Sequence, residues 1–498
     1  MKSPTLQLLP LLVVALSALA THPASAQVSL SNLASTSFKP YTAGAVKSGE
    51  AVMMGHYNSG QMLRLTLGLQ PPHVLEEQEF LQQLQIKGKG GFHKFLSAEE
   101  WTNRFDPSVE DEQAVVDWAT SQGLTITHRF PNRLIVDVEG TVSTIEKAFN
   151  VTMNSYQLGT KTFFSNDRDP EIPSSLIGIV HSVGGLQNLQ VMQPANKSVK
   201  EPTFPDYSPG PAVSRGQAES KNGDRSKLPE GLKKSASQSS QATGGPNYTT
   251  GAPYDPADMY STAGYSAYAL YNRGYCCNPT GNSGVTPPQT SIAIATSGSQ
   301  QTSDMVGFQS YFPYLAYHFQ EYYIDGTPTC CDGEGTMDME WSTAMANSFG
   351  SYVNTAMVYM YDGVNSGFGT FNDIYNTMLT DGYARNFSTS WGWVDATLDG
   401  GDMDTADAIF SSMIGQGWTL TAASGDGGAS YSCQDFDSVS FPASDPNVVA
   451  AGGATLYMSG GPPPTFDSIY AWSGGPDGCS TNDGGSTGGF SNYWTEPS

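Results

Sequence analysis

Residues 291–296 read Ser-Ile-Ala-Ile-Ala-Thr, an apolar run that is too short for a typical helix. The run predicts a strand buried on both faces, because a half-exposed strand would alternate apolar and polar side chains. Strand-like and helix-like runs then alternate along the chain. We predict strands at 352–359, 386–390, 418–423 and 448–451, and helices at 337–349, 371–379 and 405–414. Such alternation is typical of an α/β fold with a mostly parallel sheet flanked by helices.

The acidic residues are concentrated in the second half of the chain. The 498 residues include 47 Asp and Glu against 23 Lys and Arg, a formal net charge of −24. Residues 251–498 hold 25 of the acidic side chains and only two basic ones, Arg273 and Arg385. A surface of this kind repels phosphates and anionic lipids, so we expect no nucleic-acid partner and no membrane partner. The charge indicates either an adaptation for solubility or a protein that works in acid, where carboxyls lose their charge.

The N-terminus resembles a secretory signal peptide over residues 1–26. Lys2 is followed by an apolar stretch at 8–20 and by a small-x-small cleavage site at 24–26. No apolar run reaches the ~20 residues of a membrane span. We therefore expect a secreted, extracellular protein. All six cysteines lie in the acidic half, and export would permit structural disulfides with 15 possible pairings.

Two further segments precede the acidic half. Residues 27–192, with a core at 60–190, have the pattern of an α+β domain, in which we predict helices at 74–84, 108–122 and 144–149 and a strand at 133–138. Residues 193–250 are rich in Pro, Ser, Gly and Lys, which predicts an exposed linker that is open to processing. The remaining domain comprises residues 251–498.

Carboxylates are the candidates for proton transfer in the acidic half, because His318 is its only histidine and lies in an aromatic run. Glu334 and Asp338 would face the same way if the helix begins by Glu334. Two close carboxyls raise one pKa, so the pair could act as a general base and its supporter. The alternative is a solvated helix start, where acids favour the helix dipole.

Two glycine-rich segments supply further candidates. Asp426 stands in Ser-Gly-Asp-Gly-Gly directly after a predicted strand, where a carboxyl would point into a cleft. Ser486, among glycines at 483–489, could be an exposed nucleophile with backbone N–H groups free to bind an oxyanion. A plain glycine-rich turn is the alternative for each segment.

Several motifs resemble those of the sedolisin family, the serine-carboxyl peptidases with a subtilisin-like fold. Residues 334–338 match the family's Glu-x-x-x-Asp element, and residues 425–428 match its Gly-Asp-x-Gly element. Residues 388–392, Ser-Thr-Ser-Trp-Gly, look like its substrate-lining strand. Residues 94–101, Lys-Phe-Leu-Ser-Ala-Glu-Glu-Trp, and the segment at 145–149 are similar to the family's activation prodomain. The resemblance implies a subtilisin-like peptidase domain preceded by an α+β prodomain.

The resemblance also implies roles for individual residues. Glu334 would be the general base, Asp338 the group that holds and tunes it, and Asp426 the acid on the oxyanion side. Ser486 is disfavoured, because residues 488–492 look like the loop that precedes the family's nucleophile. The family's Gly-Thr-Ser nucleophile motif does not occur in the sequence. We therefore expect the nucleophile and the family's calcium loop beyond this chain, with a truncated and inactive member as the alternative.

The sequence thus predicts a secreted zymogen of an acid-acting endopeptidase. Its expected partners are protein or peptide substrates and its own prodomain, which would block the cleft until acid releases it, and we expect a monomer. Two alternatives stay open: a tripeptidyl aminopeptidase of the same family, and a catalytically dead secreted binding protein. Calcium is the expected cofactor, with no ligands in this chain.

Overall fold

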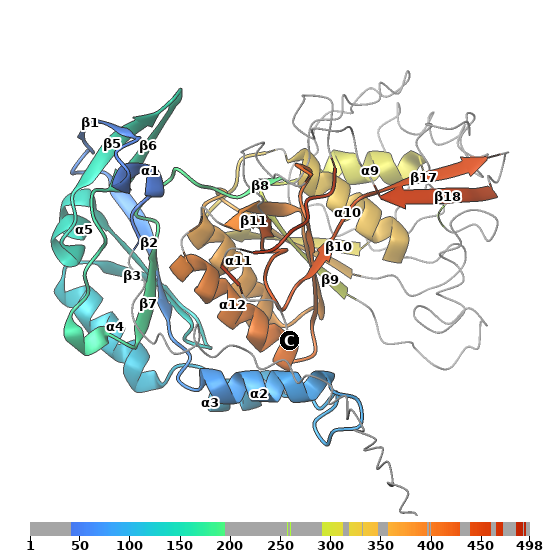
Figure 1. Cartoon of the computed structure of the whole chain (residues 1–498), viewed down its shortest axis with the longest axis horizontal. Coiled ribbons are helices and arrows are strands. Elements are labelled where there is room, and N and C mark those ends of the chain that lie inside the picture. Colours follow the sequence, from blue (N-terminus) through green and yellow to red (C-terminus); the bar gives the residue numbers. More distant parts are fainter. Residues whose placement is uncertain are drawn as a thin grey trace, which may run out of the picture.

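The structure is a computed structural model that describes residues 41–194, 256, 259, 291–311, 318–330, 332–346, 357–395, 398, 400–428, 439–459, 465–471, 485–491 and 493–494. The predicted signal peptide and most of the predicted linker lie outside these ranges. Figure 1 shows an N-terminal domain, blue to green, beside a second domain, yellow to red. No helix in the described ranges is long and apolar enough to cross a lipid bilayer.

The second domain is built on a six-stranded sheet in the order β10-β11-β9-β12-β14-β16. Every neighbouring pair in it is parallel. Its strands are β9 (Ser291–Ser297), β10 (His318–Ile324), β11 (Met357–Gly363), β12 (Asn386–Thr389), β14 (Thr419–Ala423) and β16 (Val449–Ala451). The helices beside it are α9 (Thr302–Tyr311), α10 (Gly333–Ala346), α11 (Phe368–Asp381) and α12 (Gly400–Gly415). The predicted α/β fold with a mostly parallel sheet is therefore confirmed.

Helices cover both faces of this sheet, as the apolar run at its centre predicted. Ala293 and Ala295 of β9 pack into a core with α11 and α12. Ile294, between them, packs on the other face with Met305 of α9 and Met339 of α10. Successive side chains of a strand point to opposite faces, so a strand covered on both sides must be apolar throughout. Figure 1 shows α11 and α12 on the side of the sheet that faces the N-terminal domain.

Some predicted element positions were inaccurate. The strand predicted at 352–359 overlaps β11, which extends further, to Gly363, and includes the buried carboxyl of Asp362; residues 352–356 lie outside the described ranges. The helix predicted at 337–349 begins earlier, at Gly333. The prediction omitted α9, β10 and four further strands, namely β13 (Trp391–Val394), β15 (Ser440–Phe441), β17 (Ala454–Ser459) and β18 (Thr465–Ala471).

The N-terminal domain is α+β, as predicted. Its four-stranded antiparallel sheet has the order β3-β4-β2-β7, and a second sheet has the order β1-β5-β6. The helices predicted at 74–84, 108–122 and 144–149 are present as α2, α4 and α5, and the strand predicted at 133–138 overlaps β4. The elements are α1 (Gly44–Lys47), β1 (Val52–His56), β2 (Met62–Leu69), α2 (Val74–Gln85), α3 (Ala98–Arg104), α4 (Val109–Ser121), β3 (Thr125–Arg129), β4 (Ile135–Thr141), α5 (Val142–Phe149), β5 (Met153–Leu158), β6 (Lys161–Asn166) and β7 (Val180–Gly184).

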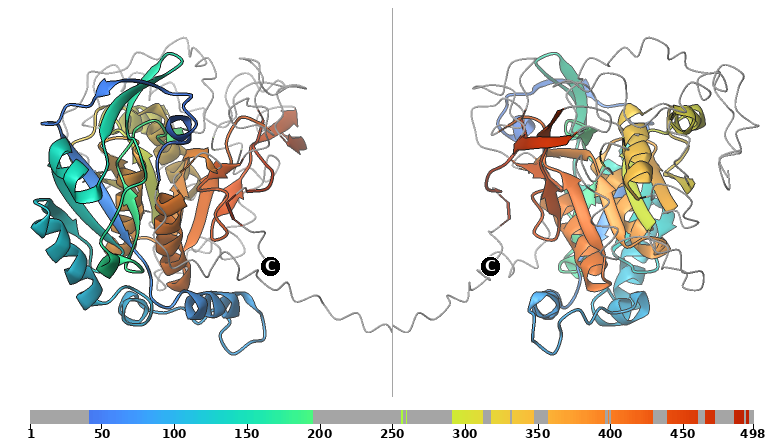
Figure 2. Two further views of the ribbon diagram at one scale, coloured as in Figure 1. Left: turned by 60° about the vertical axis from the view of Figure 1, so that its left-hand side comes forward. Right: turned by 90° about the vertical axis from the view of Figure 1, so that its right-hand side faces the viewer.

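Strand β2 contacts both domains through its two faces. The leucines on one face belong to the N-terminal domain's own core, namely Leu65, Leu67 and Leu69. On the other face, Gly68 lies so close to Thr405 of α12 that a Cβ would not fit. The Oγ1 of Thr405 is also 2.8 Å from the Oγ of Ser182 and 2.9 Å from Nε2 of His181, both on β7. The two domains therefore pack directly, as the views in Figure 2 also show.

Arg64 of β2 is the cation of a charge cluster between the domains. Its guanidinium contacts Asp137 of β4 at 2.8 Å, Asp373 of α11 at 2.6 Å, and Asp325, which follows β10. Burial raises the pKa of Asp137 and of Asp373; the neighbouring carboxylates add to the effect, and Arg64 opposes it. Because three carboxyls share one guanidinium, the cluster is neutral only when two of them are protonated.

Replacing Arg64 by Met is expected to lower the free energy of unfolding by about 3–5 kcal/mol at pH 7, because buried carboxyls would lose their only cation in the cluster. Urea denaturation measures the loss. Arg168→Met is the matched control: Arg168 pairs with Asp167 at an exposed position, where water screens the charges, and we expect little change. Equal losses in the two variants would contradict a special role for the cluster.

Candidate active site

A side-chain cap fixes the start of α10. The Oδ1 of Asp332 accepts a hydrogen bond from the Glu334 N–H at 3.1 Å, and its Oδ2 accepts one from the Gly335 N–H at 2.9 Å. An aspartate in this place satisfies N–H groups that have no partner within the helix. The cap explains why α10 begins at Gly333, earlier than the apolar pattern predicted, and it brings Glu334 into the first turn.

Glu334 and Asp338 lie one turn apart on α10. Glu334 is buried, and Oδ2 of Asp338 is enclosed without a hydrogen-bond partner among the described residues. The Oδ1 of Asp338 accepts a hydrogen bond from Ser390 Oγ at 2.9 Å. Burial and then the Glu334 carboxylate raise the pKa of Asp338 to about 7, against the opposing effect of Ser390. Asp338 is therefore protonated in mild acid, as expected for one member of a close carboxyl pair.

Strand β9 is linked to the same helix start through hydroxyl and indole groups. Thr296 Oγ1 donates to Asp332 Oδ2 at 2.6 Å and accepts from Trp391 Nε1 at 3.0 Å. Trp391 was expected only as part of a substrate-lining strand, and Thr296 and Asp332 had no predicted role, although an aspartate before a helix is an N-cap signal. Thr296 and Trp391 could not be found by spacing, because they are joined only by the fold.

The carboxyl ends of β9, β12 and β14 form one edge of the sheet, because these strands are parallel neighbours. Ser390 and Trp391 directly follow β12, and Asp426 lies in the loop after β14. In that loop Gly425 has a φ of 100° and Gly428 a φ of 68°, which glycine adopts without strain. Asp426 therefore stands at the same edge as the α10 carboxyls, two strands away from β9.

Ser486 lies in a loop that pairs with the Asp426 loop, since the Gly485 N–H donates to the Asp426 carbonyl at 3.1 Å, whereas His318 lies at the opposite end of the sheet. Ser486 Oγ accepts a hydrogen bond from the Gly453 N–H at 2.6 Å and donates to the Gly453 carbonyl at 3.1 Å, so it anchors one loop to another. His318 is the first residue of β10 and pairs with Met357, the first residue of β11. It therefore stands at the amino end of the parallel strands, the end opposite the carboxyl cluster.

The end of the N-terminal domain reaches the strand beside this edge. Gln193 and Pro194 form β8, which pairs antiparallel with Trp391 and Gly392 of β13. These two residues were predicted to belong to the linker, and the structure places them in a strand instead. The Met192 N–H also donates to the carbonyl of Ser366 at 2.8 Å. The chain of the N-terminal domain thus occupies the edge of β13 next to Ser390.

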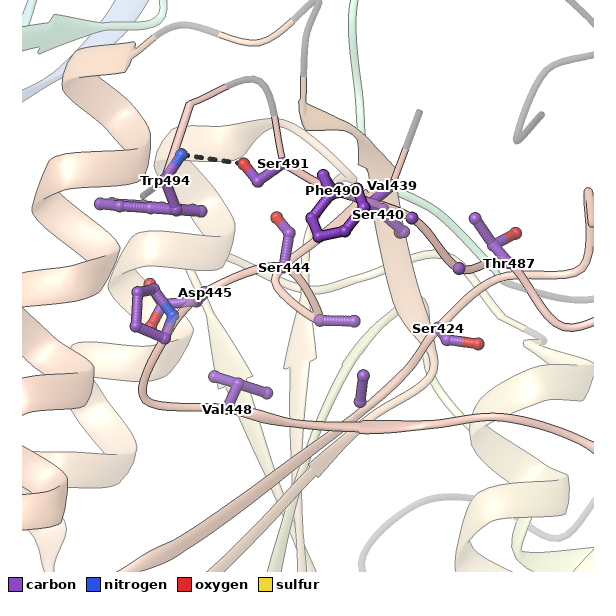
Figure 3. A pocket seen from close by; sticks show the side chains of 15 residues that line it. Ser424, Val439, Ser440, Ser444, Asp445, Val448, Thr487, Phe490, Ser491 and Trp494 are labelled. Carbon is purple, nitrogen blue, oxygen red and sulfur yellow. Dashed lines mark hydrogen bonds between the residues drawn. The ribbon is translucent and has the colours of Figure 1, made fainter. Parts of the chain in front are cut away.

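A pocket of about 430 Å³ lies beside the Asp426 loop (Figure 3). Asp445 on its wall is buried, and its pKa is raised well above the usual range by burial and by Asp407. None of the three predicted catalytic carboxyls lines it. Its lining residues include Ser424, Val439, Ser444, Asp445, Phe490 and Trp494.

The described residues contain no group of three or more His, Cys, Asp or Glu side chains that could hold a metal ion. The Asp residues around Arg64 do not form one, because a guanidinium fills their centre.

Comparison with known proteins finds a family match in the N-terminal domain and relatives that extend over both domains. Residues 50–189 match the family described as "Pro-kumamolisin, activation domain". Sedolisin of Pseudomonas sp. (strain 101) is 26% identical over 98% of this chain and 75% of its own length. Xanthomonalisin of Xanthomonas sp. (strain T-22) is 26% identical over 91% of this chain and 53% of its own. Kumamolisin of Bacillus sp. (strain MN-32) is 23% identical over 78% of this chain and 61% of its own.

A solved structure of Pseudomonas sedolisin, a serine-carboxyl proteinase complexed with two molecules of pseudo-iodotyrostatin, has 25% sequence identity to this chain and a TM-score of 0.36. The match covers 42% of this chain and 59% of the sedolisin chain. The sequence matches define the class of protein, a peptidase precursor that joins an activation domain to an α/β domain. Within that class, the chain is similar over most of its length to the serine-carboxyl peptidases of the sedolisin family.

Substituting Gly335 is expected to disturb the start of α10. A Cβ at Gly335 would lie 2.9 Å from Asp332 Oδ2 and from Thr296 Oγ1, and closer still to the buried Gln300 side chain. We expect Gly335→Ala to lower the free energy of unfolding by about 1–3 kcal/mol, as overpacking does. Gly333→Ala is the control, because its Cβ would meet open space. Urea denaturation of both variants provides the measurement, and equal stabilities would show that the cap is not tightly packed.

Proposed function

We propose that the protein is the zymogen of a secreted, acid-acting serine-carboxyl endopeptidase. Glu334 is the general base. Asp338 is the protonated neighbour that holds and tunes Glu334, and Asp426 is the acid that faces the oxyanion. The observation that carries the proposal is the pair on α10, in which burial and a neighbouring carboxylate keep Asp338 protonated beside Glu334. The nucleophile is a serine from a Gly-Thr-Ser motif of the kind that family members carry, which these 498 residues do not contain.

The carboxyls suit acyl transfer without histidine. Glu334 takes the proton of the serine hydroxyl as the serine oxygen attacks the peptide carbonyl carbon, and it later delivers that proton to the leaving amine. A carboxylate is a weak base, but a fraction of it stays ionised near pH 4, where histidine is already protonated and can no longer accept a proton. Asp426, when protonated, donates a hydrogen bond to the oxyanion that forms. The reaction therefore requires a working pH well below neutrality.

The contact of β8 with β13 supports an inhibitory role for the activation domain. A peptide substrate that added a strand along Trp391 and Gly392 would need the edge that Gln193 and Pro194 occupy. The substrate edge is therefore covered as long as the activation domain is in place. Cleavage in the segment after Pro194 would allow β8 to leave.

Export is supported by two features. The first 26 residues have the pattern of a signal peptide. Cys330 is disulfide-bonded, and structural disulfides persist mainly in exported proteins. Calcium stays a prediction from the family resemblance.

Glu334→Gln tests the proposed base in a protein that carries this sequence together with any continuation of its reading frame. We expect acid proteolysis of an internally quenched peptide at about pH 4 to fall at least 100-fold, the size of effect typical of a lost general base. Glu340→Gln, on the same helix, is the control: burial and Asp304 raise the pKa of Glu340 to about 8, so its carboxyl is already neutral in acid. We expect this variant to keep most of the activity.

Three results would count against the proposal. Substantial activity in Glu334→Gln would exclude Glu334 as the base. Cleavage restricted to tripeptides from free amino termini would indicate a tripeptidyl aminopeptidase. Inactivity of the parent protein at every pH would favour a binding protein.

A further inference from the structure

The chain segment that includes β13, the proposed substrate-binding strand, is also linked by hydrogen bonds to the part of α10 that bears Glu334 and Asp338. Ser390, at the junction of β12 and β13, donates directly to Oδ1 of Asp338 at 2.9 Å. Trp391, the next residue, acts through Thr296, whose hydroxyl donates to Asp332 at the start of α10. Two adjacent residues, one between β12 and β13 and one at the start of β13, therefore reach the carboxyl pair by two separate routes.

The direct route distinguishes the two oxygens of Asp338. Its Oδ1 accepts the hydroxyl hydrogen of Ser390, whereas Oδ2 is buried without a partner among the described residues. An ionised oxygen enclosed without a donor is costly, whereas a protonated oxygen is much less so. When Asp338 is neutral, its proton therefore belongs on Oδ2, with Oδ1 kept as the acceptor for Ser390.

The indirect route fixes the helix start that carries Glu334. Oδ2 of Asp332 accepts both the Thr296 hydroxyl, at 2.6 Å, and the Gly335 N–H, at 2.9 Å. The Thr296 hydroxyl can donate to Asp332 only if its proton points there, and the indole N–H of Trp391 enforces this by occupying its acceptor side. Trp391 thus orients Thr296, and Thr296 orients the cap.

We propose that Ser390 and Thr296 are positioning residues for the carboxyl pair: Ser390 selects Oδ2 of Asp338 as the oxygen that carries the proton, and Thr296 holds the Asp332 cap that places Glu334. The inference rests on the proposed function for its catalytic meaning, although the arrangement itself can be tested without catalysis. The proposed peptide-binding strand and the proton-transfer groups are then joined by a continuous set of hydrogen bonds.

Among the described residues, the groups that shift the pKa of Asp338 are Glu334 on the same helix, Asp332 just before it, and Ser390 between β12 and β13, and none of them is a cation. Strand β9, which packs against α10, has no titratable side chain at 291–297. Helix α9 contributes Asp304, which acts on Glu340. The titratable side chains of β11, which also packs against α10, are Tyr359, Tyr361 and Asp362.

The first experiment titrates Asp338 by NMR in the full chain labelled with ¹³C at aspartate carboxyl carbons, with Asp338→Asn to assign the signal. A hydrogen bond to a carboxylate lowers its pKa, so we expect Ser390→Ala to raise the titration midpoint of Asp338 by about one pH unit. Ser486→Ala is the control, because that hydroxyl bonds only to Gly453. An unchanged midpoint in Ser390→Ala, or an equal rise in Ser486→Ala, would overturn the role of Ser390.

The second experiment measures amide hydrogen exchange at Glu334 and Gly335, the two N–H groups that Asp332 caps. Thr296→Val keeps the shape of the side chain but removes the hydroxyl, and we expect exchange at these amides to accelerate about 10-fold or more. Thr296→Ser restores the hydroxyl and should restore slow exchange. Equal exchange in Thr296→Val and the parent protein would overturn the role of Thr296.

Neither experiment measures proteolysis, so failure of the positioning proposal is distinguishable from failure of the proposed function. If titration and exchange change as expected but Glu334→Gln retains activity, Ser390 and Thr296 position the carboxyl pair as proposed, but Glu334 is not the general base. If titration and exchange are unchanged in the variants but Glu334→Gln loses activity, the proposed peptidase function is supported and the positioning roles of Ser390 and Thr296 are rejected.

Discussion

The structure depends on burying carboxyl groups where almost no cations are available to neutralise them. Residues 251–498 hold 25 acidic side chains and two basic ones. Burial is the first cause of a raised pKa at several of these acids, namely Asp338, Glu340, Asp373, Asp402 and Asp445. An ionised carboxylate in the interior costs several kcal/mol unless it is paired, whereas a protonated one costs much less. In this domain, bound protons therefore neutralise buried carboxyls that Lys or Arg side chains would neutralise in an ordinary protein.

The same constraint shapes the contact between the two domains. Burial and the charge of Asp407 raise the pKa of Glu77 on α2. Burial raises the pKa of Asp402 on α12 to about 7, and the side chain lies against Gly184 of β7. These groups favour the packed state when they are protonated, so mild acid strengthens this part of the interface. Arg64 is the cation that the activation domain contributes. The arrangement favours cleavage after β8, rather than protonation of these groups, as the step that frees the substrate edge.

The sequence was most informative where one element alone determines the structure. The apolar run at 291–296 predicted a strand buried on both faces, and β9 is such a strand. The helical pattern at 108–122 predicted α4, and Val115 and Ala119 on one side of that helix are fully buried. In these cases the periodicity of one segment records directly which of its sides is covered.

Contacts between distant segments could not be predicted in this way. Thr296 and Asp332 meet because a loop after β9 packs on the start of α10, and no local pattern marks that meeting. The strand predicted at 352–359 stops short of Asp362, although β11 extends to Gly363 and the Asp362 side chain is buried. The family resemblance suggested the α10 pair, whereas the hydrogen bonds that hold the pair became visible only in the fold.

The pH dependence of the unfolding free energy of the intact chain tests the central claim that buried carboxyls are kept protonated. Asp106, Asp338, Glu340 and Asp402 have pKa values of about 6, 7, 8 and 7 in the folded protein. Unfolded carboxyls titrate near pH 4, so the folded state binds more protons between about pH 4 and pH 8, and stability falls as pH rises through that range. We expect urea denaturation to show a loss of at least about 3 kcal/mol between pH 5 and pH 8. Stability that stays constant or rises over this interval would contradict the account.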